Sequence, residues 1–310
     1  MTQSISPTDR RSAGTILITG ASSGIGRATA HLYAERGWSI VVCARGRDGL
    51  AAVADECLQR GAAAVAVKPV DVVRGDDVTK VVTEVVEQFG RLDVCVHSAA
   101  VMSYGTFLDT PAEVFDHAVS VDLLGSANVA RSTLTVFRDQ EHGHLVVIGS
   151  LLGRIAVPWM GTYVTSKWGL RGLTRVLQQE VRQYPGVHVS AVAPGAVNTP
   201  IYEQAATVVG RAGSPPPPVA EPEVIARAVA AVVRRPQRER DADAVFGLVN
   251  KFASAGYSLV PAVFDRLVGP LMWRFGIARE PKDDSEGNVF HSRTAPPPRK
   301  VTARTGDRPH

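Results

Sequence analysis

Three side chains near the middle of the chain have the types and spacing that proton transfer requires. Tyr163 and Lys167 stand four residues apart, so a helix would place them on one face. A phenol titrates near pH ~10 and is a poor base at neutrality, but a neighbouring ammonium favours the phenolate. A Tyr-x3-Lys alone usually marks a helix surface. A phenol beside an ammonium can nevertheless give or take a proton near neutral pH. Ser150, which follows an apolar run and one glycine, stands 13 residues before Tyr163.

A glycine-rich turn near the start of the chain has the pattern of a phosphate-binding loop. Its sequence is Thr-Gly-Ala-Ser-Ser-Gly-Ile-Gly over residues 19–26, between an apolar run and a helical pattern. Glycines let backbone N–H groups approach a pyrophosphate, and the helix presents its positive N-terminal end to the anion. A plain tight turn is the alternative. The position between strand and helix favours nucleotide binding.

These candidate residues depend on an alternation of apolar runs and helical patterns. The runs are short and rich in Val and Ile, as in parallel strands that helices cover on both faces. Such alternation predicts βαβ crossovers and one α/β domain with a doubly wound parallel sheet. A long loop is expected over residues 198–220 and a helix over 221–233. The expected strands are 15–19, 38–43, a third around 65–67, 92–96, 145–148 and 187–192.

The spacing Thr-Gly-x3-Gly-x-Gly, together with Ser150 and Tyr-x3-Lys, resembles the short-chain dehydrogenase/reductase family over residues 13–235. The resemblance implies a Rossmann-like fold and hydride transfer between a nicotinamide cofactor and a carbonyl or alcohol. Tyr163 would give or take the hydroxyl proton, Ser150 would bind the reacting carbonyl, and Lys167 would lower the Tyr163 pKa and hold the nicotinamide ribose. The cofactor-binding residues that it implies are Gly20, Ser22, Ser23, Gly24, Ile25, Gly26, Asp71, Ser98, Ala99, Tyr163, Lys167, Pro194, Gly195, Val197 and Thr199.

The end of the second strand indicates which cofactor is preferred. A carboxylate there would accept hydrogen bonds from the adenosine 2′-hydroxyl and repel a 2′-phosphate. The sequence Val42-Cys43-Ala44-Arg45 has no acid, and Arg45 offers a fork of donors to a phosphate. A solvated arginine at a helix start is the alternative. We therefore expect NADP(H) rather than NAD(H).

Two positions depart from the family pattern. Where the family carries Asn-Asn-Ala-Gly after the fourth strand, this chain has His97-Ser98-Ala99-Ala100, and His97 is interpreted as a structural brace. Where the family uses an asparagine whose carbonyl holds a relay water, this chain has Asp122. Asp122 keeps that carbonyl, and its charge could pair with Lys167. We therefore include Asp122 among the catalytic residues and expect an altered pH profile.

Apolar residues near the predicted centre suggest a lipophilic substrate such as a steroid, a retinoid or a long aliphatic carbonyl, although several of them could simply be core. Residues 246–280 form an apolar extension to the domain at 13–245, with the spacing of an amphipathic helix. That helix would pack on the core or on a sister subunit, or rest on a membrane. Residues 281–310 are polar and predict a mobile tail. The substrate-side candidates are Met102, Leu151, Leu152, Val157, Trp159, Met160 and Tyr202.

Composition excludes several other classes. The chain has 310 residues, of which 45% are hydrophobic, so whole-chain disorder is excluded, and three cysteines are too few for a disulfide scaffold. The net charge of +4 is small and its basic residues form no stripe with aromatics, so nucleic acid is not expected as a partner. No signal peptide, membrane span or metal site is predicted, so a cytoplasmic location is expected. The family commonly forms dimers or tetramers, and the alternative function is a catalytically weak nucleotide-binding scaffold protein.

Overall fold

A seven-stranded, all-parallel sheet forms the centre of the molecule. The computed structural model describes residues 12–235, 244–245 and 247–292. The strand order is β12-β7-β6-β4-β1-β2-β3, which confirms the predicted α/β class. All six expected strands are present, and β12 is added at one edge. Their bounds are β1 Thr15–Thr19, β2 Ser39–Ala44, β3 Ala64–Pro69, β4 Val94–His97, β6 Gly143–Ile148, β7 Val187–Ala193 and β12 Ala244–Val245.

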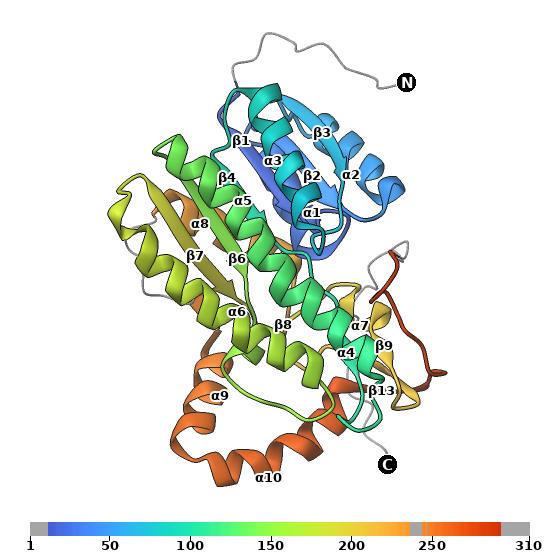
Figure 1. The fold of residues 1–310 in the computed structure, drawn as a ribbon. Helices are drawn as coiled ribbons and strands as arrows, with labels where there is room; N and C mark the ends of the chain where they lie inside the picture. The colour runs from blue at the N-terminus through green and yellow to red at the C-terminus, as the bar shows by residue number, and fades with distance from the viewer. Residues whose placement is uncertain (1–11, 236–243, 246, 293–310) are drawn as a thin grey trace, which may run out of the picture.

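Helices cover both faces of this sheet (Figure 1). Alternate residues of β1 show why: Ile16 and Ile18 join a buried cluster with α1, α2 and α8, whereas Leu17 joins a cluster with α3, α5 and α6. The side-chain period of two in a strand sends neighbours to opposite faces. The helices are α1 Gly24–Ala34, α2 Arg47–Gln59, α3 Gly75–Phe89, α4 Ala112–Val119, α5 Gly125–Asp139, α6 Gly161–Glu180 and α8 Pro222–Arg234.

The strand order creates a crevice at one edge of the sheet. β1 and β4 lie side by side in the middle of the sheet. After β1 the chain continues to β2 and β3 on one side, and after β4 it continues to β6 and β7 on the other. In open α/β sheets, ligands bind at the carboxyl ends of the strands at such a switch point. The glycine turn follows β1, and residues 98–99 follow β4, so both border this crevice.

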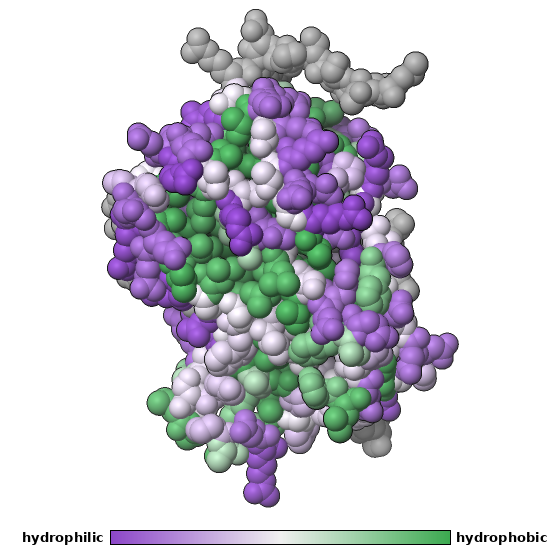
Figure 2. Space-filling model, viewed as in Figure 1, coloured by the Kyte–Doolittle hydropathy of each residue, from purple (hydrophilic) through white to green (hydrophobic). Residues whose placement is uncertain are grey.

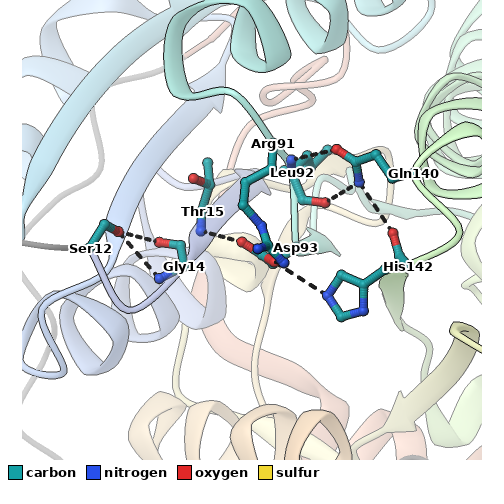
Figure 3. Close-up of polar contacts among 8 residues, drawn as sticks. All are labelled: Ser12, Gly14, Thr15, Arg91, Leu92, Asp93, Gln140 and His142. Atoms are coloured by element: carbon teal, nitrogen blue, oxygen red, sulfur yellow. Dashed lines mark hydrogen bonds and ion pairs between the residues drawn. The ribbon is translucent and has the colours of Figure 1, made fainter.

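The amino ends of the same strands are tied together by Asp93 (Figure 3). One Asp93 carboxylate oxygen accepts the backbone N–H of Thr15 at 2.8 Å, and the other contacts Arg91 and the His142 ring. Asp93 itself is only 7% exposed. A buried carboxylate with three partners fixes the start of β1 beside β4, at the end of the sheet opposite the crevice.

The predicted long loop over residues 198–220 is present and carries short elements. β8 Ala196–Val197 pairs with β11 Val219–Ala220, and β5 Ser103–Tyr104 pairs with β9 Ala206–Thr207. The four-residue helix α7 Ile201–Gln204 lies between β8 and β9 in the chain. These pairings fold the loop back over the carboxyl ends of β4 and β7, where it forms one wall of the crevice.

The extension after α8 consists of two helices rather than the single helix expected from its periodicity. α9 spans Gly247–Leu259 and α10 spans Pro261–Leu271. Pro261 removes a backbone donor and stands at the start of α10, so the first helix ends before it. The π-helical turn Met272–Gly276 follows, and β13 Ile277–Pro281 then pairs antiparallel with β10 Arg211–Gly213.

The tail that composition predicts as mobile is packed against the body as far as the structure describes it. Ser285 pairs with Thr207 through two backbone hydrogen bonds of 2.8 and 2.9 Å. Val289 is 0% exposed, and the Phe290 ring lies 4.9 Å from the His117 ring. Residues 281–292 are packed rather than mobile because two apolar side chains within this polar stretch, Val289 and Phe290, anchor the segment to the body. Residues 293–310 lie outside the described residues.

Candidate active site

A cavity of about 610 Å³ occupies the crevice at the carboxyl ends of the strands. It runs from the loop after β2, past the glycine turn, to the start of α6. All but two of the residues predicted for catalysis or cofactor binding line it; Gly26 and Asp122 do not. The sequence therefore located the walls of one continuous site from segments that are far apart in the chain.

Glycine is required at several points of the turn after β1. Gly20 has φ +67°, and a Cβ on it would meet the backbone N of Ala99 at 2.7 Å. A Cβ on Gly26 would meet the carbonyl oxygen of Gly20 at 2.3 Å, so Gly26 lets α1 pack tightly rather than lining the cavity. The exposed backbone beside the start of α1 fits the phosphates of a dinucleotide.

Ser150 and Tyr163 meet at the floor of the cavity. Ser150 follows β6 and accepts the N–H of Leu152 at 3.1 Å, which fixes its side chain at the start of a short 3-10 turn. Its hydroxyl hydrogen-bonds Tyr163, in the first turn of α6. The two hydroxyls therefore form a polar pair in the cavity lining, close to Tyr202.

Lys167 lies on the same helix face, one turn after Tyr163. Its Nζ donates to the carbonyl of Ile148 at 3.2 Å and lies 5.3 Å from the centre of the Tyr163 ring. Burial lowers the pKa of Lys167, whereas the nearby Asp122 acts to raise it. The i,i+4 geometry expected from sequence is present, with the ammonium held over the ring.

The pKa of Tyr163 is raised, whereas the family resemblance implies that Lys167 lowers it. Burial raises the pKa of Tyr163, and the charges of Asp122 and Tyr202 raise it further, while the hydrogen bond from Ser150 lowers it. Removing water from a phenolate disfavours that charged form. The surroundings of Tyr163 therefore favour the neutral phenol over the phenolate.

Asp122 lies behind the cavity wall, in a π-helical turn between α4 and α5, and is 1% exposed. Its Oδ1 accepts the N–H of Val101 at 2.8 Å, and its Oδ2 has no hydrogen-bond partner among the described residues. Burial raises its pKa to about 7, although Lys167 and the Val101 hydrogen bond lower it. Asp122 does not line the cavity, so it differs in position from the other predicted catalytic residues.

His97 is the brace that the sequence analysis expects. Its Nδ1 contacts the Thr19 hydroxyl and its Nε2 contacts the Ser126 hydroxyl, each at 2.8 Å. The Ser126 hydroxyl donates to the carbonyl of Asp122 at 2.6 Å, so it accepts from Nε2–H, and Nδ1 accepts from Thr19. Burial lowers the His97 pKa to about 3. A neutral ring with both nitrogens engaged ties β1 and β4 to α5.

Arg45 reaches the cavity from the end of β2 and is held by the far end of the chain. Its two terminal nitrogens donate to the carbonyl oxygens of Asn288 at 2.5 Å and Val289 at 2.8 Å. Burial lowers its pKa, whereas Asp71 and Asp122 act to raise it. The side chain is thus held by protein partners rather than freely solvated, and no sequence pattern predicted these contacts.

The substrate side is partly as predicted. Five of the seven candidates line the cavity, whereas Val157 and Trp159 pack behind it in a small apolar cluster. Other lining residues on this side follow no motif in the sequence. They come from β5, from the loop after β7 and from the turn after α10, and they are Tyr104, Ile201, Gln204, Pro216 and Met272. Asn288 and Ser292, near the other end of the cavity, were not predicted either.

Comparison with known proteins shows which family has this architecture. The family model for short chain dehydrogenases matches residues 14–208. The chain belongs to the short-chain dehydrogenase/reductase family. Its fold, its oxidoreductase class and its dependence on a nicotinamide dinucleotide follow from this membership and confirm the corresponding sequence predictions.

Relatives of the family come from distant organisms. An uncharacterized oxidoreductase, YxnA of Bacillus subtilis, is 29% identical over 279 residues, which span 89% of this chain and 77% of the relative. A D-beta-hydroxybutyrate dehydrogenase of Rhizobium meliloti is 32% identical over 61% of this chain and 74% of its own length. An alcohol dehydrogenase of the archaeon Thermococcus sibiricus, solved with 5-hydroxy-NADP, is 29% identical, with a TM-score of 0.63 over 74% of this chain and 92% of its own.

Proposed function

We propose that this protein is an NADP(H)-dependent oxidoreductase that interconverts a carbonyl and an alcohol on a lipophilic small molecule. The carrying observation is the hydrogen-bonded pair Ser150 and Tyr163 in the same cavity as the glycine turn. When bound, the nicotinamide cofactor gives or takes the hydride. The protein must then bind the reacting oxygen and move one proton.

Ser150 and Tyr163 perform these two tasks. Both hydroxyls line the cavity, and a substrate oxygen bound between them would accept a hydrogen bond from Ser150. Tyr163 donates its proton when a carbonyl is reduced and accepts one when an alcohol is oxidised. Lys167 Nζ, held by the Ile148 carbonyl, is placed to bind ribose hydroxyls and to supply positive charge.

Preference for NADP(H) is supported by the end of β2. Arg45 lines the cavity, and no carboxylate stands among Val42, Cys43 and Ala44 to select a free 2′-hydroxyl. The two carbonyls that hold its guanidinium are neutral, so its positive charge stays available to a phosphate.

A lipophilic substrate is supported by the lining on the other side of Tyr163. Met102, Leu152, Met160, Ile201 and Met272 surround that part of the cavity. Apolar walls that also carry the hydroxyls of Tyr104 and Tyr202 favour a largely hydrocarbon ligand whose polar groups lie near Tyr163. The flexible methionines would adapt to its shape.

The test is a panel of carbonyls and alcohols that follows NADPH absorbance, with Tyr163→Phe as the inactive variant. We expect turnover to fall by ~100- to 10,000-fold, because that range is typical for loss of a general acid or base. Tyr184→Phe is the matched control, since Tyr184 follows α6 and does not line the cavity. Full activity of Tyr163→Phe would refute the mechanism. Tight NADPH binding without turnover on the whole panel would favour the catalytically weak scaffold protein instead.

Two surfaces support further contacts. Figure 2 shows hydrophobic side chains along α5 and α6, where Leu124, Trp168 and Val176 are exposed, and this face suits a homodimer or homotetramer. More lie over α9 and α10, where Val263, Leu267 and Leu271 are about half exposed, and this face suits peripheral contact with a membrane. No described helix is long and apolar enough to cross a membrane. Light scattering would measure the oligomer, and failure to sediment with anionic vesicles would refute the membrane contact.

A further inference from the structure

The C-terminal strap, residues 285–292, crosses the mouth of the cavity. It runs from β13 past α7 toward the half of the sheet formed by β1, β2 and β3, and is drawn in red in Figure 1. Asn288 and Ser292 of the strap line the cavity. A Cβ on Gly46 would lie 2.9 Å from the Ser292 hydroxyl, which places the strap's end against the loop after β2. The strap therefore forms a wall of the adenosine end.

Four kinds of contact fix the strap in place. Ser285 pairs with Thr207, and Asn288 binds Gln204 through its backbone N–H at 2.8 Å and its side chain at 3.1 Å. Val289 is fully buried in the cluster that contains Val72 and Val121. Gly287 has φ +57°, and a Cβ on it would meet the Gln204 carbonyl at 2.2 Å. The strap is thus built into the wall rather than resting loosely on it.

We propose that the strap completes the adenosine subsite by holding Arg45 in position for the 2′-phosphate of NADP(H). Consecutive carbonyls, of Asn288 and Val289, each accept a hydrogen bond from a different terminal nitrogen of Arg45. A guanidinium has five N–H donors, so three remain for a ligand. The proposal rests on the NADP(H) preference proposed above, and it adds that the strap is needed for that preference.

The physical reason is preorganisation. A free arginine side chain loses rotamer freedom when it is fixed on a ligand. Here the strap fixes it beforehand, and neutral carbonyls do so without cancelling its charge. A phosphate then gains charge-assisted hydrogen bonds at a smaller entropic cost.

The test measures dissociation constants of NADP⁺ and NAD⁺ by calorimetry, without turnover. Gly287→Ala should lift the strap, because the added Cβ meets Gln204 and the positive φ is strained. Gly90→Ala is the matched control: Gly90 has φ +76° and nothing within 4 Å of an added Cβ. We expect Gly287→Ala to lower the preference for NADP⁺ over NAD⁺ by roughly tenfold, the loss typical of a charge-assisted hydrogen bond. Gly90→Ala should leave the preference unchanged.

A double-mutant cycle shows whether the strap acts through Arg45. Arg45→Ala alone should lower the preference, and adding Gly287→Ala should lower it no further, because both changes remove the same oriented fork. Truncation after Asp284 should match Gly287→Ala, and truncation after Ser292 should match the full chain. Thermal unfolding of each variant shows which of them are folded.

The outcomes separate the two proposals. If Arg45→Ala leaves the cofactor preference unchanged, the NADP(H) preference itself fails. If Arg45→Ala lowers the preference but a folded Gly287→Ala variant does not, only the role of the strap is overturned. Tighter NADP⁺ binding in Gly287→Ala or in the truncated chain would also overturn it, because the strap would then compete with the phosphate.

Discussion

The two ends of the cavity are built by different means. At the catalytic end, Ser150, Tyr163 and Lys167 come from one strand and the helix that follows it, and 17 residues separate the first from the last. At the adenosine end, Arg45 is held by carbonyls of Asn288 and Val289, 243 and 244 residues further along the chain. One end is local in sequence, and the other exists only after the chain has folded back on itself.

This difference suggests a division of labour. The catalytic end uses the hydroxyls and ammonium that the family motif supplies, so its chemistry is shared across the family. The adenosine end uses a segment beyond residue 208, where the match to the family model ends. We infer that the reaction type belongs to the motif and that selection of the cofactor depends on Arg45 together with the added segment that holds it.

The largest effect that would test this division is expected at the catalytic end. Ser150→Ala removes the donor to the substrate oxygen, and we expect kcat to fall by ~100- to 1,000-fold, as for loss of one oxyanion donor. The dissociation constant of NADP⁺ should not change. Ser132→Ala is the control, because Ser132 is a buried serine of α5 bonded to Thr79, away from the cavity. A large change in NADP⁺ affinity would show that the two ends are not separate.

A smaller effect is expected at the adenosine end. Arg45→Lys keeps one positive charge but loses the fork that reaches two carbonyls and a phosphate together. We expect NADP⁺ to bind about tenfold more weakly while kcat at saturating NADP(H) is unchanged. Arg60→Lys, in an exposed ion pair with Glu35, is the control. An equal fall in NAD⁺ affinity would contradict a role in reading the 2′-phosphate.

The smallest effect concerns Asp122, which faces Lys167, Arg45 and Tyr163 and so adjoins both ends. Burial raises its pKa from 3.8 to about 7, so the folded protein holds a proton that the unfolded chain releases. This contribution to stability is fully present below pH 3.8 and is lost as the pH rises through about 7. Asp122→Asn has no carboxyl to titrate, so it does not lose this stability as the pH rises. The difference in melting temperature, variant minus original protein, should therefore increase between pH 3.8 and about 7. A constant difference across the range would refute the raised pKa.

The same substitution should shift the pH dependence of catalysis. The charge of Asp122 raises the pKa of Tyr163, so Asp122→Asn should move the rising limb of alcohol oxidation to lower pH. Superimposable pH–rate curves for the two proteins would defeat this part of the proposal. Control measurements of NADP⁺ affinity at each pH separate an effect on the proton from one on binding.

Periodicity predicted most of the sheet because its strands are short, buried runs between recognisable helices. The glycine turn and the Tyr-x3-Lys pair were predicted for the same reason, since their geometry is set within a few residues. The helices of the extension were predicted less well. Its apolar spacing predicted one helix, but Pro261 divides this segment into α9 and α10. The polar composition after residue 281 hid Val289 and Phe290, whose burial depends on partners elsewhere in the chain.

The sequence by itself determined the family, the sheet and the identity of the groups that can move a proton. Those features are encoded by residues close together in the chain, where spacing fixes which side chains share a face or a turn. Only the tertiary structure decided that Arg45 is clamped, that Asp122 is buried with one oxygen unpaired, and that the surroundings of Tyr163 favour its neutral phenol. Hydrogen bonds between distant residues and the pKa values of buried groups depend on which surfaces exclude water together. That is a property of packing, which no local pattern records.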